Sequence, residues 1–116
     1  MINSTRIGWL VVVALMGSSM AARSAAAQGA ADKGAAVFVA QKCSLCHALD
    51  GKGNAKGVLD GVGTKLTAAE IRQWIVTPAE MAAKVKAERK PAMKAFPNLP
   101  KDDLDALVAF LSSKKK

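Results

Sequence analysis

The segment QKCSLCHALD, residues 41–50, holds both cysteines of the 116-residue chain and its only histidine. Cys43, Cys46 and His47 fall within five consecutive positions, and the imidazole follows the second thiol directly. Two thiols and an imidazole this close in the sequence are expected to bind one and the same group. What they bind decides the function, and because the rest of the chain is poor in large side chains, the bound group is also expected to fill the middle of the fold.

A C-x-x-C-H sequence is the attachment motif of c-type haem. Two thiols on one short turn can add to the two vinyl groups of one porphyrin, and the next residue can then coordinate the iron. We therefore expect one haem c per chain, attached through Cys43 and Cys46, with His47 as the proximal axial ligand. Other uses of the motif fit less well. A thioredoxin-like pair requires a βαβ context, a zinc site requires a fourth ligand, and a plain disulfide leaves the small core unfilled.

The first 27 residues have the layout of a secretory signal peptide. MINSTR carries one Arg and no acid, IGWLVVVALM is an apolar run, and a small-residue stretch ends in three alanines. We expect cleavage near Ala27, with an earlier cut near Ala21 or Ala22 as the alternative, and a domain over residues 28–116. An uncleaved membrane anchor is disfavoured, because a bilayer span requires roughly 20 apolar residues. The expected location is the periplasm, with no stable membrane insertion after signal removal.

The charge of the exported part limits its partners. Because Arg6 and Arg23 precede residue 28, 15 of the 17 basic residues and all nine acidic residues follow it, for a formal charge of +6. A basic exported domain is not expected to meet nucleic acid, and its charge favours encounter with acidic protein surfaces or simple solubility. Its few aromatic side chains indicate a small core that depends on a disulfide, a metal or a cofactor for stability. They are Phe38, Trp74, Phe96 and Phe110.

Apolar spacing predicts three to four helices and no convincing strand. The expected helices cover residues 32–42, a stretch after a capping box at 67–70, a stretch from Pro78 to Lys86 or Glu88, and a last stretch from Pro100 toward lysines 114–116. Their expected apolar positions are Ala35, Phe38 and Val39 in the first helix, Ile71, Trp74 and Ile75 in the second, and Leu104, Leu107, Val108 and Leu111 in the last. Residues 49–64, with five glycines, and residues 90–100, with three prolines, are expected as loops.

A second axial ligand is expected from a methionine, because the chain holds no second histidine. Met93 lies in the proline-bounded loop 90–100, which can hold a thioether over the open face of the iron. Met81 lies inside an expected helix, where core filling is the simpler role. Lys90, Lys94 or an open sixth position remain as alternatives to Met93.

The order of these parts resembles the small monohaem class I cytochromes c of bacteria. The resemblance covers residues 31–113 and rests on DKGAAVFVAQ leading into CSLCH, the loop KGVLDGVG, the segment LTAAEIRQWIVTP, the methionine loop MKAFPNLP and the closing helix KDDLDALVAFL. It implies an all-α, cytochrome c-like fold of three to four helices around one covalently attached haem. It also implies a crossing of the first and last helices, at Gly34 with Phe38 and at Leu107 with Phe110.

Two positions depart from the family pattern. Relatives commonly have a proline in the loop after the haem motif, whose carbonyl accepts a hydrogen bond from the proximal imidazole. Val58 stands there, and its carbonyl is expected to orient His47. The residue after the ligand methionine is often proline in relatives, whereas Lys94 stands here. Three further side chains are candidates for pairing with a haem propionate, with core packing or solvent exposure as the simpler explanation: Trp74, Arg72 and Lys65.

These features predict a one-electron carrier, not an enzyme, in which the soft methionine ligand raises the reduction potential. The protein is expected to be a monomer that meets acidic redox proteins transiently. Lysines expected around the haem edge, or simply solvated, are Lys42, Lys52, Lys56, Lys90 and Lys94. Two alternatives stay open: an electron-transfer subunit of a periplasmic oxidoreductase complex, and a haem enzyme or gas-binding sensor with an open sixth position.

Overall fold

The computed structural model describes the backbone of residues 18–116 and the side chains of residues 28–116. Most of the expected signal peptide, residues 1–17, lies outside the described part. The elements in chain order are α1 (Ser18–Ala40), η1 (Cys43–Leu45), β1 (Ala48–Leu49), β2 (Lys52–Gly53), η2 (Ala55–Gly57), α2 (Val62–Lys65), α3 (Ala68–Val76), α4 (Pro78–Val85) and α5 (Lys101–Ser112). The fold is therefore mostly helical, as expected. No helix of the described residues has the length and apolar character needed to cross a membrane.

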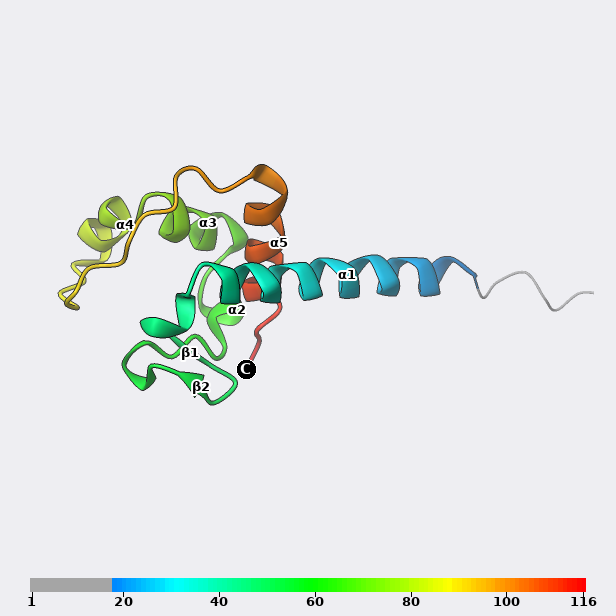
Figure 1. Cartoon of the computed structure of the whole chain (residues 1–116), viewed down its shortest axis with the longest axis horizontal. Helices are drawn as coiled ribbons and strands as arrows, with labels where there is room; N and C mark the ends of the chain where they lie inside the picture. Colours follow the sequence, from blue (N-terminus) through cyan, green and yellow to red (C-terminus); the bar gives the residue numbers. More distant parts are fainter. Residues whose placement is uncertain (1–17) are drawn as a thin grey trace, which may run out of the picture.

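The centre of the fold is the crossing of α1 and α5 (Figure 1). A Cβ on Gly34 would collide with the Ala106 carbonyl oxygen and with Phe110, so only glycine permits this approach of the two helices. The Phe38 and Phe110 rings meet edge to face at 6.0 Å, and Leu107 is 2% exposed. The expected contacts at this crossing are confirmed.

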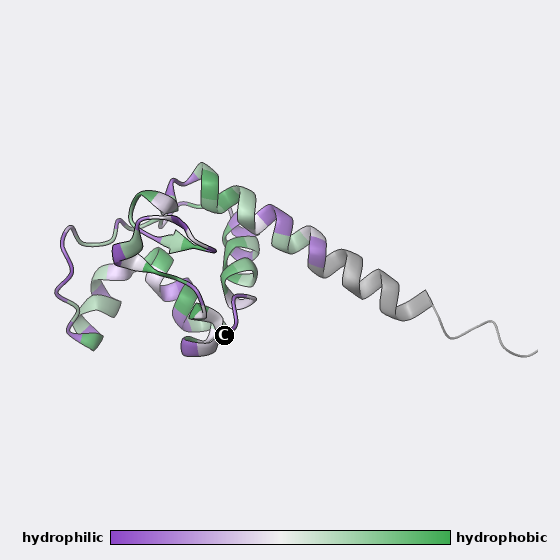
Figure 2. Ribbon diagram, turned by 90° about the horizontal axis from the view of Figure 1, so that it is seen from below, coloured by the Kyte–Doolittle hydropathy of each residue, from purple (hydrophilic) through white to green (hydrophobic). Residues whose placement is uncertain are grey.

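The apolar face of α1 is offset from the expected one. Gly34, Val37 and Phe38 are buried, whereas Val39, expected on that face, is 73% exposed. The close approach at Gly34 fixes the rotation of α1 and turns Val39 toward solvent. Figure 2 shows apolar residues on the C-terminal turns of α1 and along α5, where the two helices meet.

Helix α3 completes the core by packing on α5. Its expected capping box is present: Glu70 N–H donates to Thr67 Oγ1 at 3.2 Å, and Thr67 N–H donates to Glu70 Oε2 at 2.8 Å. Ile71 and Ile75 are then buried, at 3% and 4% exposure, and Trp74 is half-buried. This part of the sequence prediction is confirmed.

Several helix limits differ from the prediction. Helix α1 already includes Ser18, the first described residue, and so extends well before the expected start at about residue 32, because the alanine-rich stretch before Asp32 favours helix. It ends at Ala40, because Lys42 has a φ of 57°. Helix α4 does begin at Pro78 but ends at Val85, before Lys86 at a φ of 53°.

Helix α5 also has different ends from those expected. Pro100 is its N-cap, not its first helical residue, and the helix stops at Ser112. The terminal lysines therefore follow the helix. Lys114 pairs with Asp50 at 2.8 Å, and Lys115 Nζ donates to the Gly63 carbonyl at 2.7 Å, so the end of the chain is tied to residues 50–63.

The expected loop 49–64 contains regular structure, and the prediction of no strand is wrong. Strands β1 and β2 pair antiparallel, Ala48 with Gly53 and Leu49 with Lys52. Asp50 and Gly51 form the turn with φ angles of 52° and 80°, the conformation that an Asp-Gly pair favours in a two-residue hairpin. The short helices η2 and α2 follow it. This hairpin directly follows the C-x-x-C-H motif, which ends at His47.

Candidate functional site

The site is built on the turn that joins α1 to β1. Lys42 adopts a left-handed conformation that ends the α1 direction, and Cys43–Leu45 form the single 3₁₀ turn η1. The backbone N–H groups of Cys46 and His47 both donate to the Cys43 carbonyl, at 3.2 Å and 3.0 Å. This turn places the two thiols and the imidazole within five residues of one compact stretch of backbone.

Both cysteines are free thiols. Cys43 is half-buried against the core cluster, and burial raises the pKa of its thiol. Cys46 is exposed. Two unpaired thiols on one turn are what addition to a pair of vinyl groups requires, and the disulfide alternative is not formed here.

His47 is oriented by one hydrogen bond. Its Nδ1 lies 3.0 Å from the Gly57 carbonyl oxygen, and because a carbonyl only accepts, Nδ1 carries the proton. Burial lowers the pKa of His47, against the opposing effect of this carbonyl. A neutral imidazole with its proton on Nδ1 has its Nε2 lone pair free, which is the arrangement that a metal-binding histidine needs.

The expected partner of His47 was the carbonyl of Val58, and the structure corrects this by one residue. Gly57 ends the short helix η2, so its carbonyl points at the imidazole, whereas Val58 continues in an extended conformation with its side chain 53% exposed. A Cβ on Gly57 would lie 2.9 Å from His47 Nδ1. Because Gly57 has no side chain, the imidazole of His47 can lie this close to the backbone at residue 57.

Asn54 holds the loop against the attachment turn, and the sequence prediction missed it. Its side-chain Nδ2 donates to the Leu45 carbonyl at 3.2 Å, and its backbone N–H lies 3.2 Å from the carbonyls of both Ser44 and His47. Its Oδ1 also accepts from Lys56 N–H and caps η2. An Asn within a glycine-rich stretch was the available signal, since such side chains bond their own backbone two residues on.

Met93 is half-buried and lies in a mostly exposed segment without regular structure between α4 and α5. The segment has an anchor on each side of Met93. Before it, Arg89 Nη2 donates to the Cys46 carbonyl at 2.6 Å, and after it, Phe96 N–H donates to the Ile75 carbonyl at 2.9 Å. The Met93 segment is therefore tied to the attachment turn at one end and to α3 at the other.

The other candidate residues have the following positions. Met81 is buried in α4 at 6% exposure, which agrees with the simpler role of core filler. Arg72 is paired with Asp105 of α5, so its first partner is a protein carboxylate. Trp74 makes no indole hydrogen bond to the described residues, and Lys65 is exposed at the end of α2.

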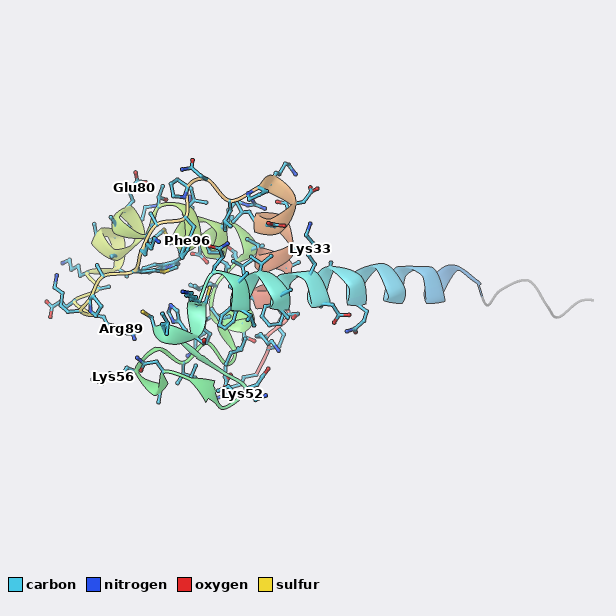
Figure 3. The ribbon with its side chains drawn as sticks, in the orientation of Figure 1. Lys33, Lys52, Lys56, Glu80, Arg89 and Phe96 are labelled. Carbon is cyan, nitrogen blue, oxygen red and sulfur yellow. The ribbon has the colours of Figure 1, made fainter. Side chains whose placement is uncertain are left out.

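The five lysines expected around the haem edge are all exposed, and none of them forms an ion pair with another described residue. They are Lys42, Lys52, Lys56, Lys90 and Lys94. In Figure 3 Lys52 and Lys56 both lie on the lower side of the molecule, whereas Lys33 lies above α1, where it pairs with Asp103 of α5.

The residues present fit a covalently attached haem. Two free thiols, an imidazole with Nε2 available and the apolar core cluster formed by the described residues are a suitable set for that group. A multi-ligand metal site is not found within the described chain, where no three His, Cys, Asp or Glu side chains group together.

The family model for cytochrome c matches residues 31–115. The chain belongs to the cytochrome c family. Comparison with curated proteins and with solved structures found no match to this cytochrome. Members of the family bind haem covalently and transfer electrons, so this cytochrome is expected to be an electron carrier more than an enzyme. The all-α expectation and the resemblance to class I c-type cytochromes are thereby confirmed.

Proposed function

We propose that the protein is a periplasmic one-electron carrier. In this proposal one haem is attached through Cys43 and Cys46, with His47 and Met93 as its axial ligands. Bound there, the haem supplies an iron centre that takes up and releases one electron. The observation that carries the proposal is the His47–Gly57 hydrogen bond beside two free thiols, because it leaves Nε2 as the free ligand atom at the attachment turn.

Met93 is favoured as the second ligand by the anchoring of its segment. The bonds of Arg89 and Phe96 hold the segment between the attachment turn and α3, whereas Met81 is already buried within α4. A thioether ligand stabilises the reduced iron relative to the oxidised iron and so raises the reduction potential.

The surroundings support transient exchange of electrons. Exposed lysines that form no ion pair with another described residue are available to attract acidic redox partners, which we take to bind transiently to a monomer. Export is supported by the order of the N-terminal segments, with residues 28–116 as the exported domain.

Carbon monoxide binding separates a carrier from a haem enzyme or gas sensor. With Met93 on the iron, the reduced protein should bind carbon monoxide slowly and cycle reversibly through one electron in voltammetry. The Met93→Ala variant serves as the open-site control and should bind carbon monoxide rapidly. Rapid binding by the wild type, equal to that of this control, would show an open sixth position and rule out the proposed carrier.

A further inference from the structure

Arg89 connects the segment that holds Met93 to the haem-attachment turn. It stands four residues before Met93, after the end of α4, and bonds the Cys46 carbonyl oxygen across 43 residues of sequence. Figure 3 shows Arg89 between this segment and η1. Within the described chain the Cys46 carbonyl accepts no other hydrogen bond, so this guanidinium is its partner.

The guanidinium fits closely at the proximal side of the site. A Cβ on Gly57 would collide with Arg89 Nη1 and with the Cys46 carbonyl oxygen, and would also crowd His47 Nδ1. Glycine at residue 57 therefore makes room for Arg89 as well as for the imidazole. The four ion pairs among residues 28–116 involve other basic side chains, so no carboxylate of the described chain draws Arg89 away from Cys46.

We propose that Arg89 is a positioning residue for Met93, an inference that rests on the proposed His47 and Met93 ligation. The bond from Arg89 to Cys46 limits how far the Met93 segment can move from the attachment turn. A hydrogen bond from a charged donor is stronger than a neutral one, and Arg combines several donors in a fixed planar group. Arg89 therefore favours the state in which Met93 is bound over the state in which it is released.

Competition with imidazole measures this effect without any assay of electron transfer. Imidazole binds ferric haem by displacing Met93, so its Kd reports how firmly Met93 is held. The Arg89→Gln variant should bind imidazole about fivefold more tightly, equivalent to about 1 kcal/mol. The matched control Lys84→Gln removes one exposed charge from the end of α4 and should stay within about twofold of wild type.

A second background tests whether Arg89 acts through Met93. In Met93→Ala, where no thioether has to be displaced, adding Arg89→Gln should leave the imidazole Kd unchanged. An equal change in both backgrounds, or no change when Met93 is present, would overturn the proposal. If Arg89→Gln yields no holoprotein, Arg89→Lys takes its place with an expected effect of about threefold, because it keeps the charge and loses the planar group.

The absorption spectrum of the ferric wild type distinguishes failure of the Arg89 proposal from failure of the proposed His47 and Met93 ligation. Its weak long-wavelength band marks thioether coordination. If this band is present and Arg89→Gln leaves the imidazole Kd unchanged, only the Arg89 proposal fails. If the wild type lacks the band, the ligation itself is refuted, and the role of Arg89 is refuted with it.

Discussion

At the scale of single residues, the site depends on backbone groups that face specific side chains. The Gly57 carbonyl fixes the proton on His47 Nδ1, and the Cys46 carbonyl accepts a hydrogen bond from Arg89. Neither interaction uses a side-chain oxygen, so each depends on how the backbone turns at residues 43–57. The small residue at position 57 is what permits both interactions at once.

Asp105 offers a residue-scale prediction about pH. Hydrogen bonds from Lys101 and Arg72 hold the pKa of the Asp105 carboxyl below its ordinary value of 3.8. A lowered folded-state pKa contributes stability above that ordinary value, and the contribution is lost as pH falls through the folded-state pKa. Asp105→Asn should therefore lower the urea midpoint modestly at neutral pH, and the difference from wild type should shrink below pH 3.8.

The control for this prediction is Asp102→Asn, since Asp102 lies on the same helix, is exposed in its first turn and makes no ion pair with the described residues. Its urea midpoint should change less than that of Asp105→Asn at neutral pH. Equal midpoints for Asp105→Asn and wild type at neutral pH would show that the bridge to Arg72 and Lys101 contributes nothing.

The sequence predicted the residues whose roles depend on their neighbours along the chain, and it missed those whose partners are distant in sequence. The roles expected for Cys43, Cys46 and His47 follow from their spacing alone, and the structure leaves them chemically available. The carbonyl that orients His47 was assigned one residue too late, because the family pattern places it at a proline that is absent here. Arg89 carries no local signal, since its partner lies 43 residues away.

At the scale of elements, the crossing of α1 and α5 organises the fold. It forms where Gly34 lets the backbone of α5 approach, and the edge-to-face pair of Phe38 and Phe110 adds about 0.5–1.5 kcal/mol beyond its buried area. Because α1 leads straight into η1, this crossing also fixes where the attachment turn lies relative to the core.

Gly34→Ala should destabilise the protein by about 1–3 kcal/mol, because the added methyl group collides with the Ala106 carbonyl and with Phe110. Gly29→Ala is the matched control on the same helix, where an added Cβ meets nothing within 4 Å. Thermal unfolding of the two variants should show a clear loss for Gly34→Ala and little change for Gly29→Ala. A similar unfolding temperature for both would contradict a close crossing at residue 34.

The elements were predictable where periodicity or capping is strong. The capping box at Thr67 and the start of α4 at Pro78 were both confirmed, because each depends on neighbouring residues. The hairpin was missed although Asp50-Gly51 is a favourable turn pair, because two-residue strands show no alternation. The face of α1 was misjudged at Val39, since the packing at Gly34 decides the rotation of the helix.

At the scale of the whole molecule, long-range contacts close the site around the attachment turn. The terminal lysines reach Asp50 and Gly63, and Arg89 and Phe96 fix the two ends of the Met93 segment. The order of motifs was enough to predict the family and its mostly helical fold. The positions of these long-range anchors were not predictable, because they depend on how the loops fold back on each other.

The distribution of exposed lysines leads to a prediction about partners. Changing Lys52 and Lys56 to Glu should slow electron exchange with an acidic redox protein by roughly tenfold at low salt, because steering by charge sets the encounter rate. The difference should disappear at high ionic strength, where such charges are screened.

Lys33→Gln is the control, because Lys33 lies away from the hairpin and already pairs with Asp103 (Figure 3). Stopped-flow rates measured across a range of salt concentrations provide the comparison. Rates for the double Glu variant that match those of wild type at low salt would show that these lysines are merely solvated.

The most direct test of the account is the ferric absorption spectrum of the wild type, Met93→Ala and Met81→Ala. If Met93 binds the iron opposite His47, the wild type shows the weak long-wavelength band of thioether coordination, Met81→Ala keeps it and Met93→Ala loses it. A band that survives in Met93→Ala and disappears in Met81→Ala, or a wild type without the band, would contradict the proposed carrier with His47 and Met93 as its axial ligands.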